Sequence, residues 1–313
     1  MTTETLSRIR SANAAAIAEA AALLREGRLV AFPTETVYGL GADAGNDVAV
    51  AAIFAAKERP QFNPLIVHVR DLTEAEKFVE FSGDARKLAN AFWPGGLTLV
   101  LPRKKGARLS LLVSAGLDTV AIRVPANAIA QELLAEVACP IAAPSANRSG
   151  TVSPTRAEHV GDLADLVLDG GQTVVGIEST IIGFEDGKPV LLRPGAIARE
   201  KIEAVIGPLA KRSSDSINAP GQLQSHYAPK TPMRLNAKDV APNEALLAFG
   251  PALSGARVTR NLSAKCDVNE AAANLFAMMR ELDAAGTDCI AVMAVPEHGL
   301  GEAINDRLRR AAS

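Results

Sequence analysis

The amino-acid sequence predicts an α/β protein with a twisted sheet of mixed parallel and antiparallel strands and a second, smaller βαβ unit. Helix-like and strand-like segments are interleaved along residues 11–206, but hairpin-like turns interrupt their alternation, which favours a mixed sheet. Residues 207–231 lack apolar periodicity, and strands and helices then alternate again. We therefore expect a first domain over residues 10–206, a linker over 207–231 and a second domain over 232–313.

The elements of the first domain follow from hydrophobic periodicity and capping signals. Alanine-rich periodicity predicts a helix over residues 11–25, and Gly27 ends it before a buried strand at residues 29–32. Similar periodicity predicts three further helices, the second of them capped by the Ser82 hydroxyl, at residues 47–57, 82–92 and 128–136. Apolar runs predict the remaining strands at residues 64–69, 97–101, 119–124 and 139–143.

The second domain repeats a simpler pattern. We expect strands at residues 245–249 and 289–295 and helices at residues 267–285 and 302–311. The linker before them contains Gly-Pro, Ala-Pro-Gly and Ala-Pro steps. Long irregular segments of this kind are often functional lids.

Composition limits the classes of function. The chain has 313 residues, 48% of them hydrophobic, and 33 basic against 35 acidic side chains give a net charge of -2. No overall basic field exists to hold a nucleic-acid backbone. Cys139, Cys266 and Cys289 are far apart, which argues against a disulfide scaffold and a zinc site. Neither a secretory signal nor an apolar run of about 18 residues is found, so a soluble, cytoplasmic protein is expected.

The first polar motif is Pro-Thr-Glu-Thr-Val-Tyr-Gly-Leu-Gly at residues 33–41, directly after a buried strand. Ligands of α/β folds usually bind at this position. A threonine-rich edge strand that ends in a glycine turn is the plainer interpretation. A dinucleotide fingerprint is discounted, because polar residues separate the strand from the glycines and no acidic residue follows at the required spacing.

Several cations form the second signal. Lys57 and Arg59 end a predicted helix, where they could simply complement the helix dipole. Arg123 lies in the middle of a predicted strand, so it is either exposed or paired with an anion. His68 ends an apolar run, where a lone histidine is more often a core residue than a ligand.

Three weaker motifs follow at residues 143–154, 176–182 and 191–196, each with small residues, hydroxyls or an arginine. Taken together, the motifs supply Lys57, Arg59, Arg123 and Arg193 but no convincing covalent nucleophile. A phosphate-binding P-loop, a nucleophile elbow and a zinc helix are all absent from the sequence. The residues alone therefore indicate an α/β enzyme that handles a nucleotide or another anion by positioning and charge neutralisation.

The motifs also resemble those of the threonylcarbamoyl-AMP synthase family, whose catalytic part is called the YrdC-like domain. The resemblance rests on residues 33–41, Lys-x-Arg at 57–59, and on residues 64–68, 144–147, 178–180 and 192–195, in the family's order and spacing. Residues 219–221, 225–229 and 305–308 resemble the linker and tail of the longer members. Two departures are Gln222-Leu223-Gln224, where those members have a more basic stretch, and Gly96, where the family often has proline.

This resemblance implies a YrdC-like sheet followed by a Rossmann-like domain. It implies synthesis of threonylcarbamoyl-AMP and pyrophosphate from L-threonine, bicarbonate or CO2, and ATP, for N6-threonylcarbamoyladenosine modification of tRNA. Mg2+ is expected as a cofactor carried by ATP, with no metal ligand from the protein. A downstream machinery that transfers the threonylcarbamoyl group to tRNA is the expected partner.

The resemblance also implies residue roles. Lys57 and Arg59 are expected at the chemistry, with Lys57 near the phosphates or the carbamate. The residues expected at L-threonine are Thr36, His68, Arg123, Ala143 and Ser179, with Arg123 pairing the substrate carboxylate. The residues expected at ATP are Arg59, Asn63, Thr119, Ser145, Ser153, Arg193 and His226. Because His226 belongs to the linker, we expect the linker to close over the nucleotide.

Two other functions stay open at this point. A module that binds RNA directly in a basic concavity is one, and the near-neutral net charge counts against it. A carbamoyl-transfer maturation enzyme is the other. The chain lacks the acylphosphatase-like and zinc-finger segments that accompany related domains there.

Overall fold

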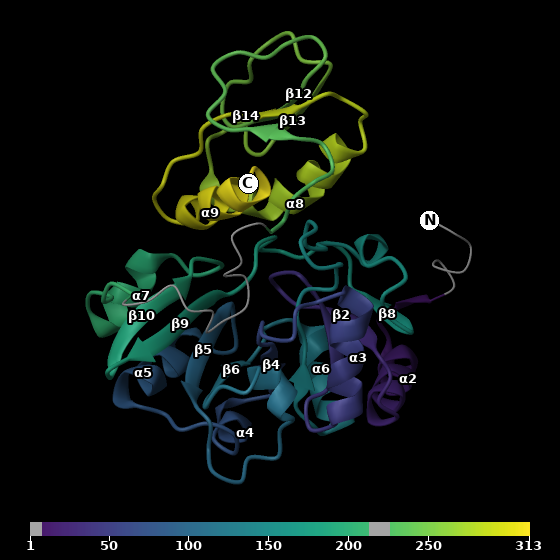
Figure 1. The fold of residues 1–313 in the computed structure, drawn as a ribbon, viewed down its shortest axis with the longest axis vertical. Coiled ribbons are helices and arrows are strands. Elements are labelled where there is room, and N and C mark those ends of the chain that lie inside the picture. Colours follow the sequence, from purple (N-terminus) through teal and green to yellow (C-terminus); the bar gives the residue numbers. More distant parts are fainter. Residues whose placement is uncertain (1–7, 213–225) are drawn as a thin grey trace.

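A computed structural model of the protein describes residues 8–212 and 226–313. Figure 1 shows a larger lower part built around one sheet and a smaller upper part that ends in the C-terminal helix. The larger sheet joins the strands in the order β1-β8-β2-β3-β7-β4-β6-β5-β9-β10. Antiparallel pairs such as β2 with β3 lie beside parallel pairs such as β4 with β6. The mixed sheet expected from the sequence is therefore confirmed.

The strands of this sheet are β1 (Ile9–Ser11), β2 (Val30–Pro33), β3 (Tyr38–Asp43), β4 (Ile66–His68), β5 (Leu97–Pro102), β6 (Thr119–Arg123), β7 (Ile141–Ala142), β8 (Leu166–Asp169), β9 (Thr180–Glu185) and β10 (Lys188–Arg193). The helices of this part are α2 (Ala14–Arg25), α3 (Asp47–Lys57), α4 (Leu72–Ala75), α5 (Gly83–Phe92), α6 (Ala128–Val137) and α7 (Arg199–Ile206). Ser82 caps α5 as expected, because its hydroxyl accepts a hydrogen bond from the Ala85 amide at 3.2 Å.

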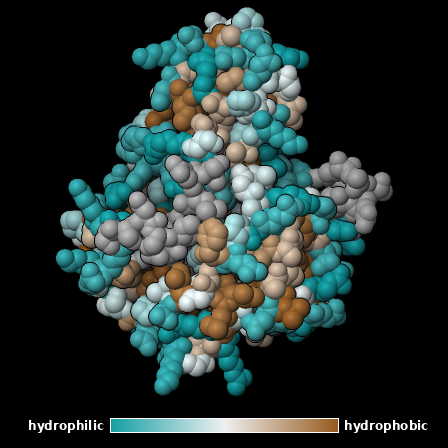
Figure 2. Space-filling model, in the orientation of Figure 1, coloured by the Kyte–Doolittle hydropathy of each residue, from teal (hydrophilic) through white to brown (hydrophobic). Residues whose placement is uncertain are grey.

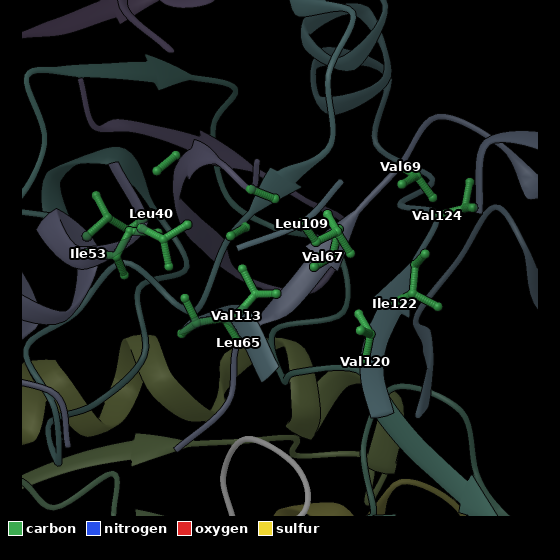
Figure 3. Close-up of a cluster of buried hydrophobic side chains, with 14 of the residues drawn as sticks. Leu40, Ile53, Leu65, Val67, Val69, Leu109, Val113, Val120, Ile122 and Val124 are labelled. Carbon is green, nitrogen blue, oxygen red and sulfur yellow. The ribbon is translucent and has the colours of Figure 1, made fainter. Parts of the chain in front are cut away.

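The two faces of the sheet bury different helices because successive side chains of a strand point to opposite sides. On β2, Val30 and Phe32 pack with α2 and α6, whereas Ala31 joins the larger core that contains α3 and α5. Figure 3 shows part of this larger core, where Val67 and Ile122 lie among other buried aliphatic side chains. The intervening residues of β4 and β6 therefore point to the opposite face.

That opposite face carries the polar residues of interest. Along β4, Ile66 and His68 alternate with the core residue Val67, and along β6, Arg123 follows Ile122. His68 pairs with Arg123 in the parallel register of β4 and β6. The sheet thus brings a histidine and an arginine side by side.

The second domain is a four-stranded parallel sheet in the order β11-β14-β12-β13. Its elements are β11 (Met233–Arg234), β12 (Ala245–Ala248), β13 (Val258–Asn261), α8 (Val268–Asp283), β14 (Ile290–Val292) and α9 (Gly301–Ala311). In Figure 1, α8 and α9 lie between this sheet and the larger domain. The expected βαβ unit is present, and β11 and β13 extend it.

Figure 2 shows that hydrophilic residues cover most of the visible face, with hydrophobic residues gathered in patches low on the larger domain. Among residues 8–212 and 226–313, the exposed large hydrophobic residues are Val48, Phe62, Leu111 and Val174. Scattered exposure of this kind is ordinary for a folded chain. Within residues 8–212 and 226–313, no helix is both long and apolar enough to cross a membrane.

Candidate functional site

A pocket opens on the polar face of the larger sheet, where the linker returns to it. Its empty space is about 520 Å³, part of which is open to solvent. Most of the residues expected to bind substrates line it, namely Thr36, Arg59, His68, Arg123, Ala143, Ser145, Ser179, Arg193 and His226. They come from strands and loops that are far apart in the sequence, so the fold, rather than any local motif, assembles the site.

The turn between β2 and β3 forms one wall of the pocket. The Thr34 hydroxyl donates to the Val37 carbonyl at 2.7 Å and accepts from the amides of Thr36 and Val37. It also lies 2.8 Å from the Thr36 hydroxyl. These bonds close a compact turn that presents the Thr36 hydroxyl to the pocket. The interpretation of this motif as an edge strand is wrong, since β3 pairs with β2 on one side and with β7 on the other.

Arg123 is buried, and each of its three guanidinium nitrogens donates one hydrogen bond within the protein. Its Nη2 donates to Glu35 Oε1 at 2.6 Å, its Nη1 to the Thr36 hydroxyl at 2.9 Å and its Nε to the Gly95 carbonyl at 3.1 Å. Burial alone would raise the pKa of Glu35, but the Arg123 guanidinium outweighs it and lowers this pKa. Of the two alternatives left open for Arg123, exposure or pairing with an anion, the structure shows the second, and the anion is Glu35 in the turn that also carries Thr36.

Ser179 and Arg193 form the opposite wall. The Ser179 hydroxyl lies 2.7 Å from the Thr98 hydroxyl, and Arg193 Nη2 donates to the Ser179 carbonyl at 2.9 Å. Gly195 lets the two segments approach, because a Cβ there would lie 2.4 Å from the Glu178 carbonyl oxygen. Residues 193–195 are thereby held against residues 178–179, and the Arg193 guanidinium faces the pocket.

Lys57 and Arg59 occupy different positions relative to the pocket. Arg59 lines it and donates to the carbonyls of Asn63 and Pro64 at 3.1 and 2.9 Å. Burial lowers the pKa of Arg59 to about 10, so it stays charged at neutral pH. Lys57 lies behind the wall, where its ammonium group donates to the carbonyls of Ser145 and Asn147. Any contribution of Lys57 passes through that loop.

Two buried histidines line the pocket and are neutral at pH 7. Burial, together with the nearby Arg123, lowers the pKa of His68 to about 3. Burial also lowers the pKa of His226 to about 3, with Arg59 acting in the same direction and Glu178 against it. The Nδ1 atoms of both rings are buried and have no hydrogen-bond partner among the described residues. Each ring can therefore offer a neutral nitrogen to a polar ligand.

The remaining expected residues, Asn63, Thr119 and Ser153, do not line the pocket. The Asn63 side chain is buried and has no partner for either amide atom among the described residues. Thr119 begins β6 and is half-buried, and Ser153 is buried with its hydroxyl donating to Glu178 Oε1 at 2.6 Å. Of the expected linker, residues 207–231, the stretch 213–225 with Gln222-Leu223-Gln224 lies outside the described residues.

Three lining residues with polar side chains were not assigned roles from the sequence: Thr34, Glu178 and Tyr227. Each lies inside a quoted motif, within two residues of an assigned one, so proximity in the motif was the available signal. Burial would raise the pKa of Glu178, but Arg307, Arg193 and Ser153 outweigh it and hold this pKa at about 2. The pocket therefore carries a permanent carboxylate beside its guanidinium groups.

No cluster of three or more histidine, cysteine, aspartate or glutamate side chains that could hold a metal occurs within residues 8–212 and 226–313. Glu178 is the carboxylate of the pocket wall, and Arg307 and Ser153 occupy its two oxygens. A magnesium cage made by the protein alone does not fit this donor set. A divalent ion that arrives on a triphosphate does fit it, because phosphate oxygens and water would supply the ligands.

Comparisons with known proteins find two family models that together cover most of the chain. The Sua5/YciO/YrdC family, described as telomere recombination, matches residues 22–195, and the threonylcarbamoyl-AMP synthase C-terminal domain matches residues 197–313. The threonylcarbamoyl-AMP synthase of Bacillus subtilis (strain 168) is 44% identical, over 96% of this chain and 94% of its own length. The synthase of Pyrococcus abyssi is 41% identical over 94% of this chain and 93% of its own.

Comparison with solved structures also finds relatives of this chain. The crystal structure of P. abyssi Sua5 complexed with L-threonine has a TM-score of 0.87 and 40% identity, over 95% of this chain and 94% of that one. E. coli YciO, at 25% identity and a TM-score of 0.51, covers 57% of this chain. The nearly complete overlap with Sua5 extends over both domains.

Proposed function

This chain belongs to the threonylcarbamoyl-AMP synthase family, enzymes of the nucleotidyltransferase type, and we propose that it forms threonylcarbamoyl-AMP and pyrophosphate from L-threonine, bicarbonate or CO2, and ATP. The observation that carries this proposal is that Arg59, Arg123 and Arg193 line one pocket. Guanidinium groups suit carboxylate and phosphate oxygens. The product would serve N6-threonylcarbamoyladenosine modification of tRNA by a separate transfer machinery.

The chemistry needs no covalent intermediate with the enzyme. The threonine amine adds to CO2 and loses a proton, which gives a carbamate. A carbamate oxygen then attacks the α-phosphorus of ATP, the bond to the bridging oxygen breaks, and pyrophosphate leaves. The protein must hold two anions together and stabilise the charge of the leaving group, which is a task for positioned cations. Magnesium on the triphosphate would share that charge.

The threonine subsite would lie around β4 and β6. The solved Sua5 relative was crystallised with L-threonine, which supports a threonine site in this family. We place the substrate carboxylate near Arg123, with Thr36, His68, Ala143 and Ser179 around the rest of the molecule. Since Glu35 already binds Arg123, the substrate carboxylate would share this guanidinium with Glu35 or displace it.

The ATP subsite would lie on the other side of the pocket. Arg59, Ser145, Arg193 and His226 line the wall there, and Asn63, Thr119 and Ser153 would support it from nearby. The buried side-chain amide of Asn63 has no partner among the described residues. Its oxygen can accept a hydrogen bond from a nucleotide, and its NH2 group can donate one to it. Lys57 would act through the loop at Ser145, whose carbonyl accepts from its ammonium group.

Pyrophosphate release by the purified full chain tests the proposal. We expect release that requires ATP, L-threonine, bicarbonate and Mg2+ together, proceeds without tRNA, and is accompanied by threonylcarbamoyl-AMP in the mass spectrum. Pyrophosphate release that is independent of threonine or bicarbonate would show a different reaction. Tight binding of double-stranded RNA with no turnover would favour an RNA-binding module.

A further inference from the structure

One arginine of the second domain is buried against the pocket of the first. Arg307 lies on α9, and its side chain is fully buried. Its Nε donates to Glu178 Oε2 at 3.0 Å, and its Nη1 donates to the Pro194 carbonyl at 2.8 Å and to Asp306 Oδ2 at 2.7 Å. Arg307 is thus a buried, charged side chain of the second domain that binds residues of the first domain.

The same guanidinium also contacts the end of the linker. It lies over the Tyr227 ring, 5.3 Å from the ring centroid, and Tyr227 stacks on Phe276 of α8. Arg307 therefore touches the Glu178 segment, the Arg193-Pro194 segment and the linker at once. Figure 1 shows α9 on the side of the small domain that faces the larger one.

The electrostatic consequence concerns Glu178. Its carboxylate lines the pocket together with Arg59 and Arg193, and it stays ionised because its pKa lies at about 2. An uncompensated carboxylate in a poorly solvated wall would weaken the attraction of these guanidiniums for an anion. Arg307 supplies the compensating charge from behind the wall, where it does not itself occupy the pocket.

We propose that Arg307 is a positioning residue for the nucleotide site, which pairs with Glu178 so that the pocket keeps a net positive potential toward the phosphates of ATP. This inference rests on the proposed function, because it takes ATP as the anion. It also assigns a task to the second domain, which is to complete the electrostatics of a site that the first domain builds. The binding of threonine, whose carboxylate is assigned to Arg123, should depend much less on Arg307.

A purely structural role for Arg307 makes a different prediction. If Arg307 only held the domains together, its loss would weaken the binding of both substrates in proportion to the loss of folding. If it compensates Glu178, removal of the Glu178 charge should rescue the loss. Removal of the buried Glu178 charge would also restore stability, so rescue alone does not separate the two roles. The readout that separates them is a loss of ATP affinity in a folded variant that keeps its threonine affinity, followed by rescue of ATP affinity in the double variant.

The experiment measures binding of ATP with Mg2+, and of L-threonine, by calorimetry in the full chain. The variants are Arg307→Met, Glu178→Gln and the double variant, with Arg309→Met as a matched control on the same helix. Arg309 is exposed and pairs with the exposed Glu297, so its removal should change neither affinity. Thermal unfolding of each variant checks that it is folded.

We expect Arg307→Met to weaken ATP binding by about tenfold or more while threonine binding changes by less than about threefold, and the double variant to restore ATP binding to within about threefold. An Arg307→Met variant that binds ATP like the wild type, or a folded double variant as weak as the single one, would overturn the inference. If Arg307→Met does not fold, the ATP affinity of the double variant alone decides whether the inference holds. A wild-type chain that binds no ATP would instead refute the proposed function.

Discussion

The Nη2 atom of Arg123 lies 2.6 Å from Glu35 Oε1, and neither side chain is more than 15% exposed. The pair links the β2–β3 turn to β6, and the adjacent Nη1 of Arg123 donates to the Thr36 hydroxyl. Because a buried ion pair is costly to break from one side, the geometry of this wall is strongly determined. Arg123 is also the side chain whose loss should affect threonine binding most selectively.

Replacement of Arg123 by alanine should weaken threonine binding far more than ATP binding. The substrate carboxylate would lose a charged hydrogen-bond partner, which costs about 1.5–3 kcal/mol, or about tenfold to a hundredfold in affinity. ATP binding should stay within about threefold, because Arg59 and Arg193 lie elsewhere in the pocket. Calorimetry with each ligand separately measures the difference. Equal losses for both ligands would refute this division of the arginines.

The stability of the variants provides a control. Arg123→Ala leaves Glu35 buried without its partner, so it should destabilise the fold by about 3–5 kcal/mol. The double variant with Glu35→Gln should recover much of this stability but none of the threonine affinity. Arg28→Ala, which removes an exposed ion pair with Asp165, should change stability little and leave both affinities unchanged.

His68 should make the protein less stable as the pH falls. Its pKa is about 3 in the folded chain and 6.5 ordinarily, so between these values the unfolded state binds the proton and the folded state does not. Stability is complete above pH 6.5 and declines below it, by about 2 kcal/mol for this group at about pH 5. Urea unfolding at several pH values, compared with His68→Gln, measures the contribution.

The protonation state itself can be observed by nitrogen NMR of labelled histidine. The His68 ring should keep the nitrogen shifts of a neutral imidazole down to about pH 4. A ring that becomes charged near pH 6 would show that the pocket is more solvated than the structure indicates.

Chelation of divalent cations should separate the two substrates. Since no cluster of metal-binding side chains occurs among the described residues, EDTA should abolish pyrophosphate release and weaken ATP binding while leaving threonine binding unchanged. Addition of Mg2+ should restore turnover. Loss of threonine affinity on chelation would instead indicate a metal held by the protein.

Local features of the fold could be predicted from the sequence, because their causes are local. The Asp47–Lys57 helix and the Ser82 cap follow from periodicity and one hydroxyl. The strand β13, Val-Thr-Arg-Asn, was missed because it is short and mostly polar. Its place in the sheet depends on pairing with β12, which no local pattern reveals.

The site, like the fold, combines features that the sequence indicates with features that depend on long-range contacts. A cation inside a strand indicated that Arg123 is either exposed or paired with an anion, but Glu35 is 88 residues away, and only the fold selects it. The burial of Arg307 was even harder to predict, since a C-terminal helix rich in arginine normally exposes these side chains to solvent. Its partner Glu178 lies 129 residues away in another domain. The resemblance to a known family supplied the substrates, which the side chains alone do not identify.

The last prediction concerns Gly176, which lies at the contact between the domains. A Cβ on this residue would lie 2.5 Å from the Ala272 carbonyl oxygen and from Ala273 Cα of α8. Its φ of +78° is also unfavourable for alanine. Gly176→Ala should therefore displace α8, cost roughly 2–4 kcal/mol of stability and reduce pyrophosphate release, because Glu178 lies two residues away.

Gly187→Ala is the matched control for this variant. Gly187 has nearly the same φ, +76°, but a Cβ there would meet nothing within 4 Å. It should therefore show the backbone strain alone, about 1–2 kcal/mol, with unchanged turnover. The difference between the two variants, measured by urea unfolding and by turnover, isolates the contact with α8. If both variants lose the same stability and keep full activity, the contact between Gly176 and α8 contributes nothing to the site.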